Sequence, residues 1–342
     1  MRLLIITQRV DQRDTNLASH LRWIEVLASM VDEVIVIAQS IGECHLPSNV
    51  ILHSLGKERG LSRTRQLIRL FRSLSQIVPR VDAVLVLMAP LYVLLAAPFV
   101  WIFHKKMFLW YAHKRVSWLL NIAEKIVHRI FSSSPAGFRL ASGKVIFTGQ
   151  AIDTDFFVLD TTVERLPGKI VTVGRVTPAK NIHLMIEVVA ALKERGAVVQ
   201  LEVVGTPVIK SDAAYEHVLR GQVLALGLRN QVLFRGGKNP SEVRRLYQEA
   251  SLFLNVSSTG SLDRAVLEAM ACGCPVVVAN EAFKPILPSE AFVPSFDIEA
   301  LASAINLQLQ HPIDGQVLRA EVTAHHELRH TLEILLKEMQ SL

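Results

Sequence analysis

The sequence predicts an α/β protein with two doubly wound domains, each a parallel sheet covered by helices on both faces. Two observations predict this class. Short apolar runs of strand length alternate with helical patterns, and such alternation favours parallel sheets. The series also occurs twice, separated by a polar stretch without clear periodicity at 151–167. A chain of 342 residues is long enough to form two such domains.

In the first half, five apolar runs are predicted strands: RLLIIT, EVIVIA, AVLVLM, MFLWYA and KVIFTG. Helical patterns fall between them at 16–27, 62–77 and 118–130. The stretch 83–103 contains no charged residue, and its length fits a membrane span. Because two prolines interrupt it, we interpret it as a buried strand followed by a helix. A membrane span and a surface-inserting segment stay open as alternatives.

The second half repeats the pattern with the runs KIVTVG, LEVVG, VLFRG, LFLNV and PVVVA. Helical patterns lie at 183–194, 213–225 and 240–249, and a last one at 327–339. The predicted division is a first domain at 1–150, a linker at 151–168, a second domain at 169–322 and a C-terminal helix at 323–342. That helix is a candidate to pack across a cleft between the domains. Ligands of such folds bind at the carboxyl ends of the strands.

The composition of the chain indicates which classes of partner it binds and in which cellular compartment it is found. The net charge of +6 favours anionic partners such as nucleotides, phosphates or acidic lipid. The three cysteines, Cys44, Cys272 and Cys274, are too few for a disulfide framework, so we expect a reducing, cytoplasmic compartment. No G-x-G-x-x-G follows the first strand, which argues against a dehydrogenase. No stacking-platform motif accompanies the charge, so nucleic acid is not an expected partner.

The stretch TGSLDRAVLEAMACGCPVVVAN, at 259–280, places one carboxylate in an uncharged run. Ser261 is a suitable N-cap and Asp263 suits the first turn of a helix. The helix is expected to end near Cys272, because Gly273 suits the left-handed position that follows a helix. The stretch after it reads as a buried strand. Glu268 is therefore predicted on a short helix packed against a sheet.

A second stretch, VTVGRVTPAKN, places two cations where a strand ends. The strand is expected to end at Gly174, and Arg175 and Lys180 follow before Asn181, which is suited to cap the next helix. Backbone N–H groups and the helix dipole favour phosphate at such a place. Arginine adds a bidentate fork and lysine a point charge. Two solvated loop cations are the alternative interpretation.

The two stretches together resemble the retaining family 4 glycosyltransferases of the GT-B fold, most clearly over 169–280. The resemblance implies two Rossmann-like domains facing a central cleft, the first binding the acceptor and the second the nucleotide sugar. It implies that Arg175 and Lys180 stabilise the leaving diphosphate. It also implies that Glu268 accepts hydrogen bonds from both ribose hydroxyls of the donor, and enclosure by apolar residues strengthens such bonds.

The resemblance adds donor-side candidates on loops at strand ends. These are Gly174, Gly205, Arg235, Gly236, Gly260, Ser261 and Leu262. Among them, Arg235 and Gly236 are the candidates for contact with the nucleobase, with plain loop residues as the alternative. One departure concerns a glutamate that the family carries eight residues before the ribose-binding one, next to the transferred sugar. Here that position is Gly260, and Asp263 is the nearest carboxylate. The backbone N–H groups of the 259–262 turn are an alternative means of binding a sugar or phosphate.

Candidates on the first domain follow from the same resemblance. His113 follows a strand and is a candidate to donate a hydrogen bond to a sugar hydroxyl, against a structural role. Asp11 and Asp14 lie on the loop after the first strand and are candidates to contact an acceptor hydroxyl, against plain surface positions. The stretch 57–74 interleaves basic and apolar residues, as does a helix that lies on anionic lipid. A core-packed helix with a solvated basic face is the alternative.

The function that these features imply is transfer of a sugar from a nucleotide sugar, UDP- or GDP-linked, to a glycan or lipid-linked acceptor with retention. No cofactor is expected, because the nucleotide sugar is a substrate. No Asp-x-Asp pair or His/Cys cluster is present in a fitting loop, so metal independence is predicted. The expected location is cytoplasmic, with peripheral contact at an anionic membrane. A nucleotide-sugar epimerase or hydrolase and a non-catalytic scaffold stay open as alternatives.

Overall fold

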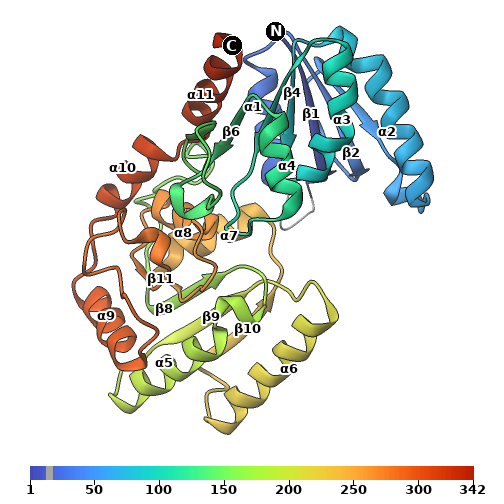
Figure 1. The fold of residues 1–342 in the computed structure, drawn as a ribbon. Helices are drawn as coiled ribbons and strands as arrows, with labels where there is room; N and C mark the ends of the chain where they lie inside the picture. The colour runs from blue at the N-terminus through green and yellow to red at the C-terminus, as the bar shows by residue number, and fades with distance from the viewer. Residues whose placement is uncertain (13–17) are drawn as a thin grey trace. The chain divides into compact units, whose positions relative to one another are not determined.

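The computed structural model describes residues 1–12 and 18–342 and separates the chain into two compact units, each built on one parallel sheet (Figure 1). The first unit contains residues 1–151 and 328–342, and the second contains residues 152–327. The predicted class, two parallel sheets with helices between their strands, is confirmed. The predicted cleft between the domains stays a prediction.

The sheet of the first unit has the strand order β3-β2-β1-β4-β5-β6-β7. Its strands are β1 (Arg2–Val10), β2 (Glu33–Ile41), β3 (Val50–Ser54), β4 (Ala83–Leu87), β5 (Lys106–Trp110), β6 (Arg129–Ser132) and β7 (Val145–Phe147). Its helices are α1 (Ala18–Ala28), α2 (Arg63–Ile77), α3 (Pro90–Ile102), α4 (Trp118–Ile126) and α11 (Leu328–Ser341).

Helices cover both faces of this sheet because alternate side chains of a strand point to opposite faces. In β1, Leu4 and Ile6 pack with α2, α3 and α4, whereas Leu3 and Ile5 pack with α1 and α11. All four side chains are fully buried. Burial on both faces explains why the strands of this sheet read as continuous apolar runs in the sequence.

Of two predictions for this unit, one is confirmed by the structure and the other is wrong at one end of a helix. The uncharged stretch 83–103 forms the buried strand β4 and the helix α3, as preferred. Among the described residues, no helix has both the length and the apolar character needed to cross a bilayer. The predicted end of the helix at 118–130 was wrong, because α4 ends at Ile126 and β6 begins at Arg129. The residues RIFS pair with β5 on one side and β7 on the other, so they form a strand of the sheet.

The sheet of the second unit has the order β10-β9-β8-β11-β12. Its strands are β8 (Leu166–Val173), β9 (Gln200–Val204), β10 (Val232–Gly236), β11 (Ala250–Asn255) and β12 (Val276–Val278). Its helices are α5 (Ile182–Glu194), α6 (Lys210–Ala225), α7 (Pro240–Glu249), α8 (Arg264–Ala271), α9 (Ile298–Gln310) and α10 (Gly315–His325). Helices α5, α6 and α9 share a core on one face, and the rings of Tyr247 in α7 and Phe253 in β11 meet on the other.

The chain enters and leaves the second unit at neighbouring positions. The backbone N–H of Ile152 donates to the carbonyl of His326 at 2.7 Å, where Ile152 and Glu327 form a parallel bridge. Helix α11 then adds buried side chains to the core of the first unit, namely Leu328, Leu332, Leu335, Leu336 and Met339. Residues 152–165, expected in the linker, belong to the second unit, and the Phe157 ring lies 6.1 Å from that of Tyr247. The assignment of the units to acceptor and donor stays a prediction.

Two arginines satisfy backbone carbonyls where the second unit's segments meet. Arg165 donates to the carbonyls of Tyr247, Gln248, Ala250, Cys272 and Gly273. Arg319 donates to those of Thr154, Phe157 and Ala271. Buried carbonyls without a partner cost free energy, so each guanidinium fixes several chain segments at once.

Candidate functional site

The topology of the second sheet identifies where a ligand is expected. From β8 the chain first builds β9 and β10 on one side, and then β11 and β12 on the other. The direction therefore changes between β8 and β11, and ligands of open α/β sheets bind at the carboxyl ends of strands at such a switch point. The loops that follow β8 and β11, at 174–181 and 256–263, both start there.

An ion pair joins these two loops. Lys180 Nζ lies 2.9 Å from Asp263 Oδ2, and both side chains are largely enclosed. Asn255, at the end of β11, donates to the same carboxylate oxygen at 2.9 Å, and the Thr259 hydroxyl lies 3.5 Å from the other oxygen. The cation predicted to bind diphosphate is therefore held at the switch point by a carboxylate.

Backbone contacts hold the same loops together. The side-chain amide of Asn181 donates to the carbonyl of Val256, and the N–H of Ser258 donates to the carbonyl of Ala179, both at 3.0 Å. Asn181 occupies the predicted N-cap position of α5, but its side chain makes no cap hydrogen bond. The neighbouring Arg175 is exposed and forms no ion pair within the described part of the chain.

Two predicted glycines lie where the strand ends approach most closely. Gly174 and Gly205 have φ values of 150° and 144°, which side chains rarely adopt. A Cβ on Gly205 would lie 1.8 Å from the carbonyl oxygen of Gly174, and one on Gly174 would lie 3.3 Å from Lys180 Cε. The N–H of Gly205 donates to the carbonyl of Gly236 at 2.8 Å. The ends of β8, β9 and β10 thus form one continuous backbone edge.

The turn before α8 contains two backbone donors that are unused within the described residues. Gly260 has a φ of 62°, Leu262 is buried, and the carbonyl of Ser261 accepts from Asn280 at 2.8 Å. In the described residues, the N–H groups of Gly260 and Ser261 make no hydrogen bond. The prediction of Ser261 as N-cap is wrong, because α8 begins at Arg264 with Asp263 at the N-cap position and no side-chain cap.

Glu268 lies on α8 with two protein partners. The Tyr247 hydroxyl lies 3.4 Å from Oε2 and donates to it, and Arg264 Nε lies 3.6 Å from Oε1. Only 16% of the Glu268 side chain is exposed. Burial raises the pKa of this carboxyl, and the Arg264 charge and the Tyr247 hydroxyl oppose that shift. A short helix against the sheet is thus confirmed, whereas ribose binding stays a prediction.

Arg235, predicted near the nucleobase, has a carboxylate partner. Its guanidinium donates to Glu202, a buried side chain of β9. Lys169 Nζ lies 4.0 Å from the other carboxylate oxygen. A contact between Arg235 and a base would have to form beside this pair.

Two of the three candidates of the first unit lie on loops that the structure describes. Asp11 is buried and accepts from Arg9 at 2.7 Å. Gly42 lies directly against it, since a Cβ there would be 2.2 Å from the carboxylate. Asp14 lies outside the described residues. His113 follows β5 and is exposed, and its Nδ1 accepts from the N–H of Arg115 at 3.0 Å. The roles of all three stay predictions.

Sequence reasoning missed the partners of the key residues. Arg264 stands four residues before Glu268, a spacing that brings side chains together on a helix, so this pair was visible in principle. The contact between Tyr247 and Glu268 joins α7 to α8, and no local pattern in the sequence indicates it. The same holds for Lys180 and Asp263, which are distant in sequence and meet only because β8 and β11 are neighbours.

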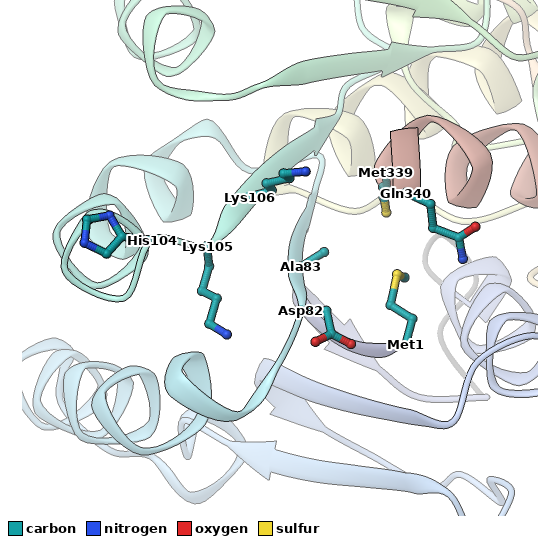
Figure 2. Close-up of a pocket in the computed structure, with 8 residues that line it drawn as sticks. All are labelled: Met1, Asp82, Ala83, His104, Lys105, Lys106, Met339 and Gln340. Atoms are coloured by element: carbon teal, nitrogen blue, oxygen red, sulfur yellow. The ribbon is translucent and has the colours of Figure 1, made fainter. Parts of the chain in front are cut away.

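A hollow on the first unit lies at the wrong edge for this kind of site. Figure 2 shows it between the starts of β1, β4 and β5 and the end of α11, with Asp82, Lys105 and Lys106 around it. These are the amino ends of the strands, whereas ligands bind at the carboxyl ends. Asp82 there accepts from the backbone N–H of Arg2 at 2.7 Å. This hollow is therefore not part of the candidate site.

Most of the second unit matches a known protein family. Residues 163–322 match the family described as glycosyl transferases group 1. The "Putative colanic acid biosynthesis glycosyltransferase WcaL" of Escherichia coli (strain K12) is 30% identical over 213 residues, 58% of this chain and 50% of WcaL. The alpha-monoglucosyldiacylglycerol synthase of Streptococcus pneumoniae is 25% identical over 50% of this chain and 35% of its own length. The chain thus spans half or less of these curated relatives.

Solved structures establish the fold of the whole chain. Anabaena Alr3699/HepE in complex with UDP and glucose has a TM-score of 0.78 at 16% identity, covering 100% of both chains. The sucrose-phosphate synthase of Thermosynechococcus elongatus has a TM-score of 0.76 at 17% identity, covering 99% of both chains. Residues 163–322 therefore match the glycosyl transferases group 1 family, and the chain has the fold of these GT-B glycosyltransferase structures.

Proposed function

We propose that the chain is a glycosyltransferase that moves a sugar from a UDP- or GDP-linked donor to a glycan or lipid-linked acceptor, with retention and without a metal. One observation carries the proposal. At the switch point of the region that matches the group 1 family, the ion pair of Lys180 with Asp263 joins the loop that carries Arg175 to the loop in which the N–H groups of Gly260 and Ser261 are unused within the described residues. Fixed cations and N–H donors of this kind stabilise a diphosphate.

The proposed donor site uses residues of the second unit alone. Arg175 and Lys180 neutralise the leaving diphosphate, while Gly174, Gly205 and Gly236 let it approach the backbone edge. Glu268 accepts from the ribose hydroxyls, and its enclosure strengthens those bonds. The turn formed by Gly260, Ser261 and Leu262 faces the sugar or phosphate with backbone N–H groups, and Arg235 lies toward the base. HepE, whose structure contains UDP and glucose, supports a donor of this class.

The proposed reaction breaks the bond between the anomeric carbon and the diphosphate oxygen and forms a bond from that carbon to an acceptor oxygen. Negative charge develops on the diphosphate, where preorganised cations contribute most. The acceptor proton passes to the departing phosphate. His113 donates to a sugar hydroxyl, and Asp11 and Asp14 contact the acceptor. No cofactor takes part.

The acceptor and the location are proposed from the relatives and from charge. WcaL is named for colanic acid biosynthesis, and the synthase of Streptococcus pneumoniae is named for a glucosyl lipid. These names support a glycan or lipid-linked acceptor. We place the reaction in the cytoplasm, at the inner face of a membrane.

Nucleotide binding tests the donor site. UDP, GDP and ADP are titrated by calorimetry into the parent, Glu268→Gln and the control Glu194→Gln, an exposed glutamate at the end of α5. We expect one nucleotide to bind the parent and the control equally and to bind Glu268→Gln at least about tenfold more weakly, since a hydrogen bond to a charged group is lost. Absence of binding to the folded parent would contradict the proposal.

The affinity for that nucleotide is expected to depend on pH through Glu268. The ionised carboxylate accepts ribose hydrogen bonds, and burial raises its pKa above the ordinary glutamate value of 4.5. Binding should therefore weaken as the pH falls through that raised pKa, at a higher pH than an exposed glutamate would give. Glu268→Gln should lack this component. The phosphate groups titrate equally in both proteins, so the ratio of the two dissociation constants isolates Glu268.

A further inference from the structure

The carboxylate of Glu268 has one protein donor near each of its oxygens. The Tyr247 hydroxyl lies 3.4 Å from Oε2, and Arg264 Nε lies 3.6 Å from Oε1. Within the described residues this carboxylate has no other hydrogen-bond or ion-pair partner. An ionised carboxylate offers about four lone pairs, and both distances exceed the value of about 2.8 Å that is typical of charge-assisted hydrogen bonds. Each oxygen therefore keeps accepting capacity for a ligand.

Tyr247 is a donor in a fixed position. Its side chain is fully buried, and its ring centroid lies 5.5 Å from that of Phe253 and 6.1 Å from that of Phe157. Helix α7 carries this side chain to the neighbouring α8 (Figure 1). Burial raises the pKa of the phenol well above its usual range, and the Glu268 charge adds to that shift. The hydroxyl therefore stays protonated and donates to the carboxylate.

Arg264 is a cation that Glu268 does not balance alone. It stands one helical turn before Glu268, and 28% of its side chain is exposed. Burial lowers the pKa of this guanidinium, and the charges of Glu268 and Asp153 oppose that shift. Asp153 also accepts from the backbone N–H of Phe156 at 3.1 Å, which holds it in the segment that precedes β8. Two carboxylates thus keep Arg264 charged beside Glu268.

The remaining surroundings of α8 add little charge. Besides α7, this helix contacts α10, β11 and β12, and the two strands contain no titratable side chain. Arg319 of α10 donates to the carbonyl at the end of α8. Burial raises the pKa of Cys272 well above its usual range, so the thiol stays neutral. In the described part of the chain, Tyr247 and Arg264 are therefore the groups that orient the Glu268 carboxylate.

We propose that Tyr247 and Arg264 are positioning residues, each orienting one oxygen of Glu268 so that the carboxylate accepts from both vicinal hydroxyls of the donor ribose. This inference rests on the proposed donor site. A carboxylate that is oriented before the ligand arrives loses less freedom on binding. A 2′-deoxyribose offers only one of the two hydroxyls, so the arrangement selects ribonucleotides over their 2′-deoxy forms.

The ligand-free protein gives the first test. Glutamate carboxyl groups are labelled with carbon-13, and the resonance that is missing from Glu268→Gln belongs to Glu268. Tyr247→Phe removes a donor that favours the ionised form, so the pKa of Glu268 should rise further. Arg264→Met should raise that pKa as well, and Arg264→Lys, which keeps the charge, should raise it less. Tyr92→Phe, at a buried position on α3, and the exposed Arg229→Met are controls that should leave it unchanged.

Calorimetry gives the second test, with whichever of UDP, GDP and ADP binds the parent and with the 2′-deoxy form of that nucleotide. We expect the parent to bind the ribonucleotide about tenfold more tightly or better, and Tyr247→Phe and Arg264→Met to lower this preference at least about threefold. The control variants should keep it. In Tyr247→Phe, ribonucleotide binding should also weaken at a higher pH than in the parent, because the carboxyl group is protonated there at a higher pH.

The outcomes separate this inference from the donor site itself. If the two residues only supported the packing of α7 and α8, their variants would weaken both nucleotides equally and leave the Glu268 titration unchanged. That result would overturn the inference and retain the donor site. A parent that binds both nucleotides equally would remove the ribose from Glu268 and also overturn it. A folded parent that binds no nucleotide would overturn the donor site and the inference together.

Discussion

Replacing Lys180 by methionine is expected to weaken binding of the nucleoside diphosphate by about a hundredfold. In the proposed donor site this side chain supplies a charge-assisted contact to the diphosphate, and its loss also leaves Asp263 without its ion-pair partner at 2.9 Å. An unpaired carboxylate beside the phosphates repels them, which adds to the lost contact. Calorimetry with the nucleotide that binds the parent measures the effect. Lys210→Met, at an exposed position on α6, is the control.

A double variant separates the two contributions. Lys180→Met with Asp263→Asn removes the contact and also the repulsion, so its affinity should lie between those of Lys180→Met and the parent. If Lys180 only neutralised Asp263, the double variant would bind like the parent. That result would remove Lys180 from the donor site and leave the ion pair as a purely structural feature of the two loops.

Replacing Arg165 by methionine is expected to lower the free energy of unfolding of the second unit by about 4 kcal/mol or more. Five backbone carbonyls lose the donor that Arg165 provides, at the end of α7, the start of β11 and the turn after α8. Arg165→Lys keeps the charge but lacks the planar fork, so it should recover only part of the loss. Arg229→Met is the exposed control.

The positions of the tryptophans make this measurement specific. All four, Trp23, Trp101, Trp110 and Trp118, belong to the first unit. Urea unfolding followed by tryptophan emission therefore reports the first unit, and circular dichroism reports both. In Arg165→Met, the dichroism should show an earlier transition while the emission transition keeps its midpoint. An unchanged dichroism curve would mean that other donors or water satisfy these carbonyls.

Local patterns in the sequence predicted most elements correctly. Helix α7 begins and ends at the predicted residues, because Pro240 starts it and the Asn239 and Glu242 side chains form a capping box. Strand β12 was visible as a continuous valine run, which is typical of a strand buried on both faces. The predicted helix 118–130 included Arg129 and Ile130, the first two residues of β6, since so short a run has no periodicity that separates a strand from a helix.

The sequence identified the residues of the candidate site but not the side chains that they contact. Lys180 and Glu268 are recognisable in the sequence as charged residues within conspicuous local patterns. Lys180 lies after the carboxyl end of β8 and Glu268 lies on α8, both as expected. Their partners depend on which strands are neighbours, a property of the whole sheet. Asp263 was assigned to the first turn of α8 from local preference. It lies instead at the N-cap position, and its carboxylate turns to Lys180 rather than to the helix backbone.

The return of the chain into the first unit sets an order of folding during synthesis. Domains usually fold from the N-terminus as the chain emerges. Here the core of the first unit includes buried side chains of α11, such as Leu332 and Leu335, which follow residue 327. The second unit is contiguous and has all its strands before α11 is made. We therefore expect the second unit to complete its fold first, and the unit that begins at Met1 to close its core last.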